Sequence, residues 1–320
     1  MPSARTAAFV FALTAPAACF GDEADAGRGD RELVIYNAGS LARPMRALAD
    51  SFAAIHDVAI AQESAGSLET ARKLTELGKT PDIIALADHE IFPRLLIPRY
   101  TSWYVRFAHN RMVIAYTDRS RLAARIDSSN WWSILTREGV EVGRSDPDLD
   151  PNGYRTLLVF QLAERHYDVP GLAERLLENA PWRNVRPKEM DLVALLEAGE
   201  LDYIWSYESV ARATGLRHVE LPAAIDLSNP DDSATYAAAS VRVAGATPTD
   251  RIVIVGAPIV YGVSIPVRAP HHELAELFMA FMLSAKGRRV MRGEALDPID
   301  PPVLVGDAVP RAISDATVPP

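Results

Sequence analysis

ELVIYNAGSL (32–41) and VAIAQESAGSL (58–68) decide the fold, because each contains a strand-like run that ends in Gly-Ser and leads into a helix-like run. The two turns are Gly39-Ser40 and Gly66-Ser67. A strand that turns directly into a helix leaves unpaired N–H groups and a hydroxyl at one spot, where the helix dipole favours an anion. Two such turns in one lobe therefore predict a site for a small anion, although each serine alone is also a common helix N-cap.

Strand-like and helix-like segments continue to alternate along the chain. Further strands are predicted at 81–88, 111–117, 140–146, 201–207, 236–244 and 252–265. Helices are predicted at 45–54, 68–77, 154–167, 191–198 and 271–292. This order is typical of a doubly wound α/β protein.

The length of 320 residues favours two lobes over one core. We expect the chain to leave the first lobe near Asn110 and to return near Pro258, so that two crossover segments flank a cleft. The predicted division is lobe 1 at 31–110 and 258–300, lobe 2 at 111–257, and a loose tail at 301–320.

The N-terminus is predicted to lie outside the fold. Residues 1–18 have a basic start, an apolar centre and small residues at the end, which is the pattern of a secretory signal. The lone cysteine, Cys19, follows at once and resembles the lipidation site of bacterial lipoproteins, with plain signal cleavage as the alternative. Residues 19–30 are predicted to be a tether, and a single cysteine excludes an internal disulfide.

Composition and motif searches exclude several classes of function. A net charge of −9 argues against nucleic-acid binding, and no apolar run approaches the roughly 20 residues that span a bilayer. Gly78-Lys79-Thr80 lacks the earlier glycine of a phosphate-binding loop, and His271-His272-Glu273 lacks the second histidine of a zinc protease helix. The sequence therefore predicts no enzyme and no cofactor.

Six stretches resemble the tungstate/molybdate-binding proteins of ABC importers. They are 37–45, 63–88, 85–120, DPNGYRT (150–156), LEAGELDYIWSYES (196–209) and APIVYGVSIP (257–266), and the resemblance covers nearly all of 32–290. It implies a two-lobed periplasmic-binding-protein-like fold. It also implies a location outside the cytoplasmic membrane, an ABC permease and its ATPase as partners, and a monomer.

The resemblance also implies a set of site residues. In the two turns and in three segments of lobe 2 these residues are Gly39, Ser40, Ser67, Asp150, Pro151, Asn152, Glu189 and Tyr207, of which Asn152 stands where the family more often has a small residue or Cys. The serines would hold oxyanion oxygens, and Asp150 and Glu189 would bind the central molybdenum or tungsten directly. From the residues alone, Asp150-Pro151 also reads as a helix N-cap, Glu189 as a solvated residue and Tyr207 as a core aromatic.

Two carboxylates beside a dianion would repel it unless they coordinate the metal centre. Molybdenum(VI) and tungsten(VI) can expand from four ligands toward six, whereas sulfur in sulfate cannot. The paired acids thus favour tungstate or molybdate over sulfate. A binder of another tetrahedral oxyanion such as sulfate, and a periplasmic enzyme or sensor domain, are the alternatives.

Overall fold

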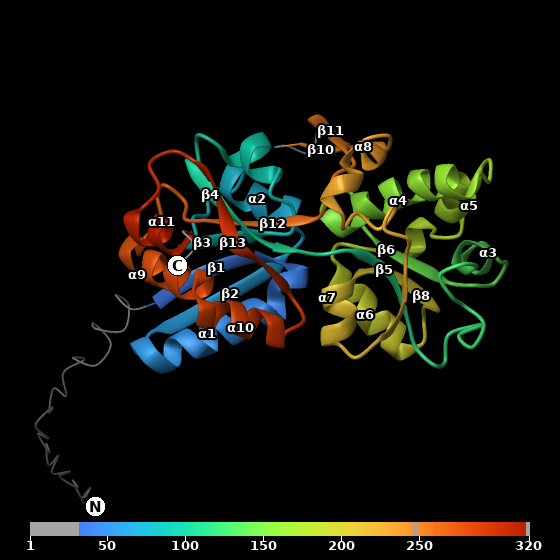
Figure 1. Cartoon of the computed structure of the whole chain (residues 1–320), viewed down its shortest axis with the longest axis horizontal. Helices are drawn as coiled ribbons and strands as arrows, with labels where there is room; N and C mark the ends of the chain where they lie inside the picture. Colours follow the sequence, from blue (N-terminus) through green and yellow to red (C-terminus); the bar gives the residue numbers. More distant parts are fainter. Residues whose placement is uncertain (1–31, 246–248, 318–320) are drawn as a thin grey trace, which may run out of the picture.

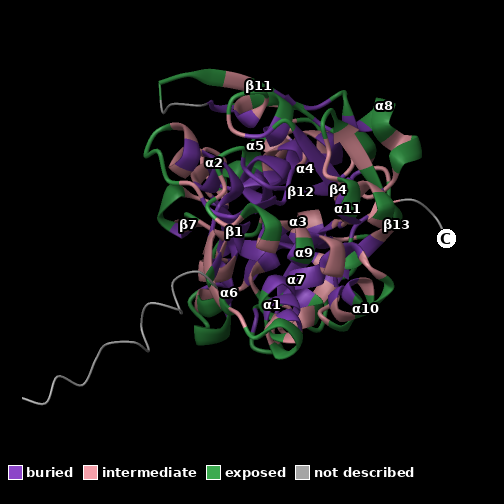
Figure 2. Ribbon diagram, turned by 90° about the vertical axis from the view of Figure 1, so that its left-hand side faces the viewer, coloured by how far each residue is buried: buried purple, intermediate pink, exposed green. Residues whose placement is uncertain are grey.

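The computed structural model describes residues 32–245 and 249–317, which form two lobes joined side by side (Figure 1). Each lobe has its own sheet, so the two-lobed α/β organisation predicted from the sequence is confirmed. Figure 2 shows that buried residues fill the interior, while exposed ones lie at the rim, as in β11 (Arg251–Val255). The predicted signal, the tether and Cys19 lie outside the described residues.

Lobe 1 is built on a six-stranded sheet in the order β13-β4-β12-β3-β1-β2. Its strands are β1 (Glu32–Ala38), β2 (Ala59–Ala65), β3 (Ile83–Leu86), β4 (Trp103–His109), β12 (Val260–Ser264) and β13 (Asp297–Gly306). Strands β1, β2 and β3 are parallel, whereas β12 runs antiparallel to both β3 and β4. The Gly-Ser turns that follow β1 and β2 therefore lie at the same edge of the sheet.

The helices of lobe 1 pack around this sheet and against one another. They are η2 (Gly39–Leu41), α1 (Ala42–His56), α2 (Ser67–Thr75), η3 (Phe92–Leu96), α9 (His272–Leu283), α10 (Ala285–Gly293) and α11 (Arg311–Thr317). In α1, for example, Met45, Leu48 and Phe52 recur at helical spacing and are all buried. The helix predicted at 271–292 is two helices, because the Ser284 hydroxyl starts α10 by accepting from the Gly287 N–H at 3.2 Å.

Lobe 2 is built on a five-stranded sheet in the order β7-β6-β8-β5-β9. Its strands are β5 (Met112–Tyr116), β6 (Val142–Ser145), β7 (Val185–Arg186), β8 (Tyr203–Tyr207) and β9 (Arg217–Glu220). Its helices are α3 (Trp131–Leu135), α4 (Pro151–Tyr167), α5 (Leu172–Glu178), η4 (Trp182–Asn184), α6 (Glu189–Ala198), α7 (Glu208–Ala213), η5 (Pro230–Asp232) and α8 (Ser233–Tyr236). No helix in the described ranges is both long and apolar enough to cross a membrane.

The chain passes between the lobes twice. It leaves lobe 1 after β4, and it returns before β12 along a segment that lies beside the first, since the Asn110 N–H donates to the Ile259 carbonyl at 3.3 Å. A hairpin of β10 (Ser240–Ala244) and β11 precedes the return and packs against α4. Arg72 and Arg94 of lobe 1 donate to hairpin carbonyls, so the hairpin bridges the two lobes.

The expectation of a loose tail at 301–320 is wrong for residues 301–317. Strand β13 pairs with β4, and α11 packs against α9. Prolines at 298, 301 and 302 concealed this strand, yet β13 lies at the sheet edge and its register shifts between Pro298 and Val303. Edge strands and bulges are where a sheet tolerates residues that cannot donate a backbone hydrogen bond.

Two predicted strands also need correction. The segment predicted as one strand at 252–265 is two strands, β11 and β12, which belong to different sheets. In the strand predicted at 236–244, Tyr236 ends helix α8, and only β10 is extended. The first error arises because an apolar run does not reveal where the chain passes from one sheet to another, and the second because a short apolar run does not distinguish the end of a helix from a strand.

Candidate functional site between the lobes

The serines of the two turns do not cap helices. No side-chain hydrogen bond caps η2, α1 or α2, all of which lie in the described part of the chain. Instead, the Ser67 hydroxyl accepts from the Ala87 N–H at 3.0 Å, and the Ser40 hydroxyl accepts from the Tyr261 hydroxyl at 3.1 Å. A hydroxyl that accepts from a donor behind it still has its own hydrogen to give. The N-cap alternative therefore fails for both serines.

The second turn meets lobe 2 through its backbone. The N–H groups of Leu68 and Glu69 donate to the Leu149 carbonyl at 3.1 and 3.3 Å. The expectation that this turn leaves its N–H groups free for an anion is thus wrong for these two residues, because lobe 2 supplies an acceptor. A Cβ at Gly66 would lie 2.3 Å from the Leu149 oxygen, so the lobes approach this closely only because the residue is glycine.

Asp150 lies opposite this turn, at the start of α4. Its Oδ1 accepts from the Asn152 N–H at 3.2 Å, as an N-cap does, and Pro151 occupies the first helical position. Its Oδ2 accepts from the Glu189 N–H at 3.1 Å. Burial raises the pKa of Asp150 to about 6, although these two N–H groups act in the opposite direction. Asp150 is therefore both a helix cap and part of a buried carboxyl pair.

Glu189 is the second carboxyl of the pair and starts α6. Its Oε1 accepts from the Ser206 hydroxyl at 2.6 Å and from the Tyr207 N–H at 2.7 Å. Its Oε2 is buried and has no hydrogen-bond partner among the described residues. Burial, together with the charge of Asp150, raises the pKa of Glu189 to about 8. The reading of Glu189 as a solvated residue is wrong, since only 1% of it is exposed.

The Gly39 turn lies beside the start of α6 across the lobe boundary. A Cβ at Gly39 would lie 3.7 Å from the Cβ of Lys188, the residue before Glu189, and 3.9 Å from the Ala65 carbonyl oxygen. The first turn thus lies beside both the second turn and the start of α6. Each Gly-Ser turn of lobe 1 therefore lies against one of the two segments of lobe 2 that carry Asp150 and Glu189.

Asn152 adds an unpaired amide to the same region. Its side chain is fully buried, and within the described residues neither Oδ1 nor Nδ2 has a hydrogen-bond partner. Burying an unpaired amide costs about 1–3 kcal/mol by protein mutational data. Such a group at a lobe boundary is suited to binding a polar ligand.

Tyr207 ends β8 and is held by a residue that the sequence did not single out. Arg155 donates from Nη1 to the Tyr207 hydroxyl at 2.7 Å. Arginine has no acceptor, so Tyr207 must accept and keeps its own hydrogen available. Tyr207 is a fully buried aromatic, as the alternative reading expected, but its hydroxyl belongs to the polar network at the boundary.

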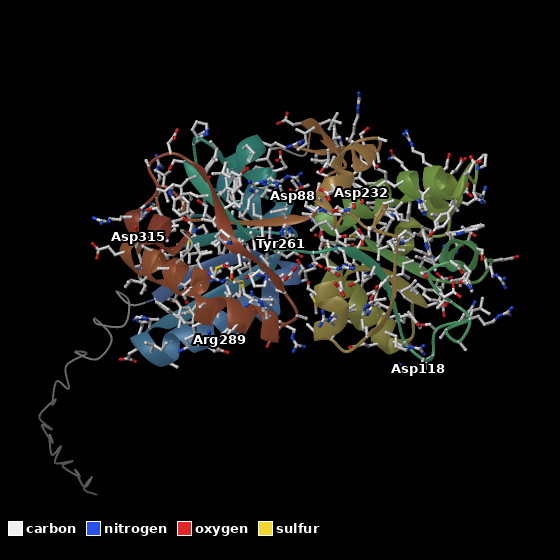
Figure 3. The ribbon with its side chains drawn as sticks, in the orientation of Figure 1. Asp88, Asp118, Asp232, Tyr261, Arg289 and Asp315 are labelled. Carbon is white, nitrogen blue, oxygen red and sulfur yellow. The ribbon has the colours of Figure 1, made fainter. Side chains whose placement is uncertain are left out.

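Arg155 and its neighbour Tyr154 also bind lobe 1. The Tyr154 hydroxyl donates to Asp88 Oδ2 at 2.5 Å, and Arg155 Nη2 lies 3.6 Å from the same oxygen. Burial alone would raise the pKa of Asp88, yet Arg155 and the Tyr154 hydroxyl hold it below its ordinary value. Figure 3 shows Asp88 near the boundary between the lobes. This buried ion pair locks the lobes together.

Tyr261, which lies within the APIVYGVSIP stretch, is buried and takes part in the site. Its hydroxyl donates to Ser40 and accepts from Asn110 Nδ2 at 2.8 Å, and its label in Figure 3 lies at the centre of the molecule. The APIVYG stretch was the only signal for it. Sequence reasoning missed the roles of Tyr261, Asn110, Arg155 and Asp88, because their partners lie far along the chain.

The predicted side chains are thus all buried, and their contacts lie at the boundary between the lobes. All of Ser40, Ser67, Asp150, Asn152, Glu189 and Tyr207 are at most 8% exposed. The hydroxyls offer hydrogens, while the carboxyl pair offers oxygens, so the arrangement suits an oxygen-rich solute with a positive centre. Their roles toward such a solute remain predictions.

A two-lobed α/β fold with a polar site buried at the lobe boundary is the architecture of a binding protein that closes around a small solute. The chain belongs to the bacterial extracellular solute-binding protein family, whose model matches residues 33–294.

Relatives of known sequence support this assignment. An uncharacterized solute-binding protein of Petrotoga mobilis is 43% identical, with 89% of each chain covered. The molybdate/tungstate-binding protein WtpA of Pyrococcus abyssi is 37% identical, with 92% of each chain covered. The resemblance identified from the sequence is therefore confirmed.

A solved structure agrees in fold. The periplasmic molybdate-binding protein of Azotobacter vinelandii matches with a TM-score of 0.58 and 16% identity, over 82% of this chain and 98% of that one. At this identity the likeness concerns the fold alone.

Proposed function

We propose that this protein captures tungstate or molybdate outside the cytoplasmic membrane and delivers it to an ABC permease. The observation that carries the proposal is the carboxyl pair of Asp150 and Glu189, buried opposite the Ser40 and Ser67 turns of lobe 1. The 37%-identical relative named as a molybdate/tungstate-binding protein supports the same ligand.

The charges of the site explain why the ligand should be one of these anions. Arg155 is a buried cation whose charge acts on Asp150, and Asp88 already pairs with it. Two ionised carboxylates would then repel a dianion by about 1–8 kcal/mol each at about 4–6 Å and an effective dielectric constant of about 20–80. Coordination of a molybdenum or tungsten centre turns this repulsion into attraction, and the unpartnered Oε2 of Glu189 is the oxygen best placed to provide it.

The hydroxyls complete the site by binding the oxygens of the anion. Ser40, Ser67 and Tyr207 each accept from a donor behind them, so each can donate forward. The Asn152 amide can donate as well. Hydrogen bonds to charged groups contribute about 1.5–3 kcal/mol each, so three or four such bonds support tight binding.

Closure follows from the contacts between the lobes. The anion enters while the lobes are apart, because the site residues are buried in the closed form. Its contacts to both lobes then stabilise the closed form, which the Asp88–Arg155 pair and the Leu149 carbonyl also hold together. The permease and its ATPase would receive this closed form. Binding, without chemical change of the anion, is the proposed activity.

Calorimetry with four anions tests the proposal. Tungstate and molybdate should bind, while sulfate and phosphate should bind roughly a hundredfold more weakly or worse, because they lack the coordination of two carboxylates. Equal affinity for all four anions would contradict the proposal and leave a general oxyanion binder.

Variants that remove the charge of one carboxyl sharpen this test. Coordination of the metal and simple charge repulsion predict changes in affinity of opposite direction. If the pair coordinates the metal, Asp150→Asn and Glu189→Gln should weaken tungstate binding. If the pair is only a negative lining, both changes should strengthen binding of every dianion. Asp191→Asn is the matched control, since Asp191 lies on the same helix two residues on and is partly exposed.

Cys19 provides the proposed anchor. A lipid on this cysteine would hold the protein beside its permease, with about 0.8 kcal/mol of membrane affinity for each buried CH₂. Mass spectrometry of the mature N-terminus together with membrane fractionation tests this. An unmodified product that begins after Cys19 and stays out of the membrane fraction would refute the anchor.

A further inference from the structure

Asn110 lies at the first crossover between the lobes, and its side-chain amide touches residues of both. Nδ2 donates to the Tyr261 hydroxyl of lobe 1 at 2.8 Å and to the Ser209 hydroxyl of lobe 2 at 2.7 Å. Its backbone N–H donates to the second crossover at Ile259. Asn110 is buried, so these bonds are shielded from water.

The orientation of this amide is fixed by its surroundings. Oδ1 accepts from the backbone N–H groups of Arg111 at 2.9 Å and of Ser209 at 3.4 Å. A backbone N–H can only donate, so the oxygen of the amide must face them. The NH₂ group then faces the two hydroxyls, and both hydroxyls must accept from it.

This orientation determines the direction of the next two hydrogen bonds. Tyr261 uses an oxygen lone pair for Asn110, so its own hydrogen goes to the Ser40 Oγ, 3.1 Å away. Ser40 in turn accepts, and no other hydrogen bond to its hydroxyl occurs among the described residues. The hydrogen of Ser40 is therefore free to be donated away from Tyr261.

We propose that Asn110 is a positioning residue which, through Tyr261, forces Ser40 to act as a donor to the bound anion. Asn110, Tyr261 and Ser40 form what we name the donor relay. Neither Asn110 nor Tyr261 needs to touch the anion for this effect.

The donor relay also determines specificity. An oxygen without a proton accepts from Ser40 more strongly than an oxygen that carries one, and the hydrogen of a protonated oxygen finds no acceptor at Ser40 while the Ser40 hydrogen points at the anion. The relay therefore selects fully deprotonated oxyanions over hydrogen phosphate at this position. This inference rests on the proposed function.

Asn110→Asp is the sharpest test, because it replaces the NH₂ group by an oxygen of nearly the same size. Tyr261 would then donate to the new carboxylate and accept from Ser40. Both hydrogen bonds of the relay would thus be reversed in direction. Ser40 would present a lone pair to the anion. Tungstate affinity should fall roughly tenfold to a hundredfold, as expected when a hydrogen bond to a charged group is lost.

A double-mutant cycle separates this reversal from the added negative charge. In a Ser40→Ala background there is no hydroxyl for the relay to orient. Asn110→Asp should then reduce tungstate affinity only by the smaller amount that its negative charge causes. The same loss of effect is expected in a Tyr261→Phe background. Full additivity of Asn110→Asp with Ser40→Ala would overturn the relay.

Tyr261→Phe alone gives an independent test that needs no change at the crossover, and its readout is the ratio of two affinities. Ser40 can still donate in this variant, but without the Tyr261 hydroxyl it is also free to turn and accept from an oxygen that carries a proton. Hydrogen phosphate should therefore gain at least about threefold relative to tungstate. Equal changes for both anions would overturn the relay.

Failure of the relay and failure of the proposed function can be told apart. If the natural protein bound neither tungstate nor molybdate, both would be refuted. If it binds them and the variants behave differently from the results expected here, only the relay is refuted.

Discussion

Gly66→Ala should weaken closure of the lobes without disturbing the fold of either lobe. The new Cβ would lie 2.3 Å from the Leu149 carbonyl oxygen and 3.3 Å from the Asp150 Cα, both of which belong to lobe 2. The backbone at Gly66 has φ −61° and ψ 146°, which any L-residue adopts. Strain therefore appears only when the lobes come together.

The loss of tungstate affinity can be calculated from the interlobe hydrogen bonds that the alanine Cβ would break. The Leu149 carbonyl accepts from Leu68 and Glu69, and moving it away removes both interlobe hydrogen bonds. Each contributes about 0.5–1.5 kcal/mol, so closure should lose about 1–3 kcal/mol. Because 1.4 kcal/mol is a factor of ten, tungstate affinity should fall roughly fivefold to 150-fold.

Calorimetric titration and small-angle X-ray scattering measure this prediction together. Gly66→Ala should bind tungstate more weakly and should contract less on binding than the natural protein. The ligand-free melting temperature should fall by no more than about 4 °C, the cost of a poorer N-cap. Gly293→Ala is the matched control, since its Cβ would meet no atom within 4 Å. Unchanged affinity and unchanged contraction in Gly66→Ala would refute the closed arrangement.

Three further predictions concern the chemistry of the site. Burial raises the pKa of Asp150 to about 6 and of Glu189 to about 8, and coordination needs both groups ionised. Tungstate binding should thus release protons and weaken as the pH falls from about 8.5 to about 6, and calorimetric proton uptake would contradict this. Ser67→Ala should reduce tungstate affinity roughly tenfold to a hundredfold. It should also reduce the free energy of unfolding in urea by about 1–3 kcal/mol, because the buried Ala87 N–H loses its acceptor. Asp88→Asn leaves Arg155 without its buried counter-charge, which costs the closed form about 3–5 kcal/mol. Stopped-flow dissociation of tungstate should then accelerate at least about a hundredfold, and an unchanged rate would refute the lock.

The parts of the site that the sequence could predict are those set by local rules. A Gly-Ser pair after a strand and before a helix identifies Ser40 and Ser67 from a few neighbouring residues. Asp150-Pro151 reads as a helix start for the same reason, and the structure has it as one. Glu189 and Tyr207 have no local signal of this kind, and only the family resemblance brought them to the site.

The residues that could not be predicted act over long separations. Tyr261 meets Ser40 across 221 residues, and Asn110 meets Tyr261 across 151. Such contacts form only because the two crossover segments lie side by side. The residues next to each partner in the sequence give no indication of this arrangement. The same limit explains β13, whose prolines argue against a strand until its place at the sheet edge is known.

X-ray absorption at the tungsten edge of the tungstate-bound protein tests the central claim most directly, because it counts the oxygens around the metal. If Asp150 and Glu189 coordinate the centre, the spectrum should contain four short tungsten–oxygen distances and two longer ones, and Glu189→Gln should remove a longer one. Four short distances alone, unchanged in that variant, would show an ordinary tetrahedral anion and would contradict coordination by the carboxyl pair.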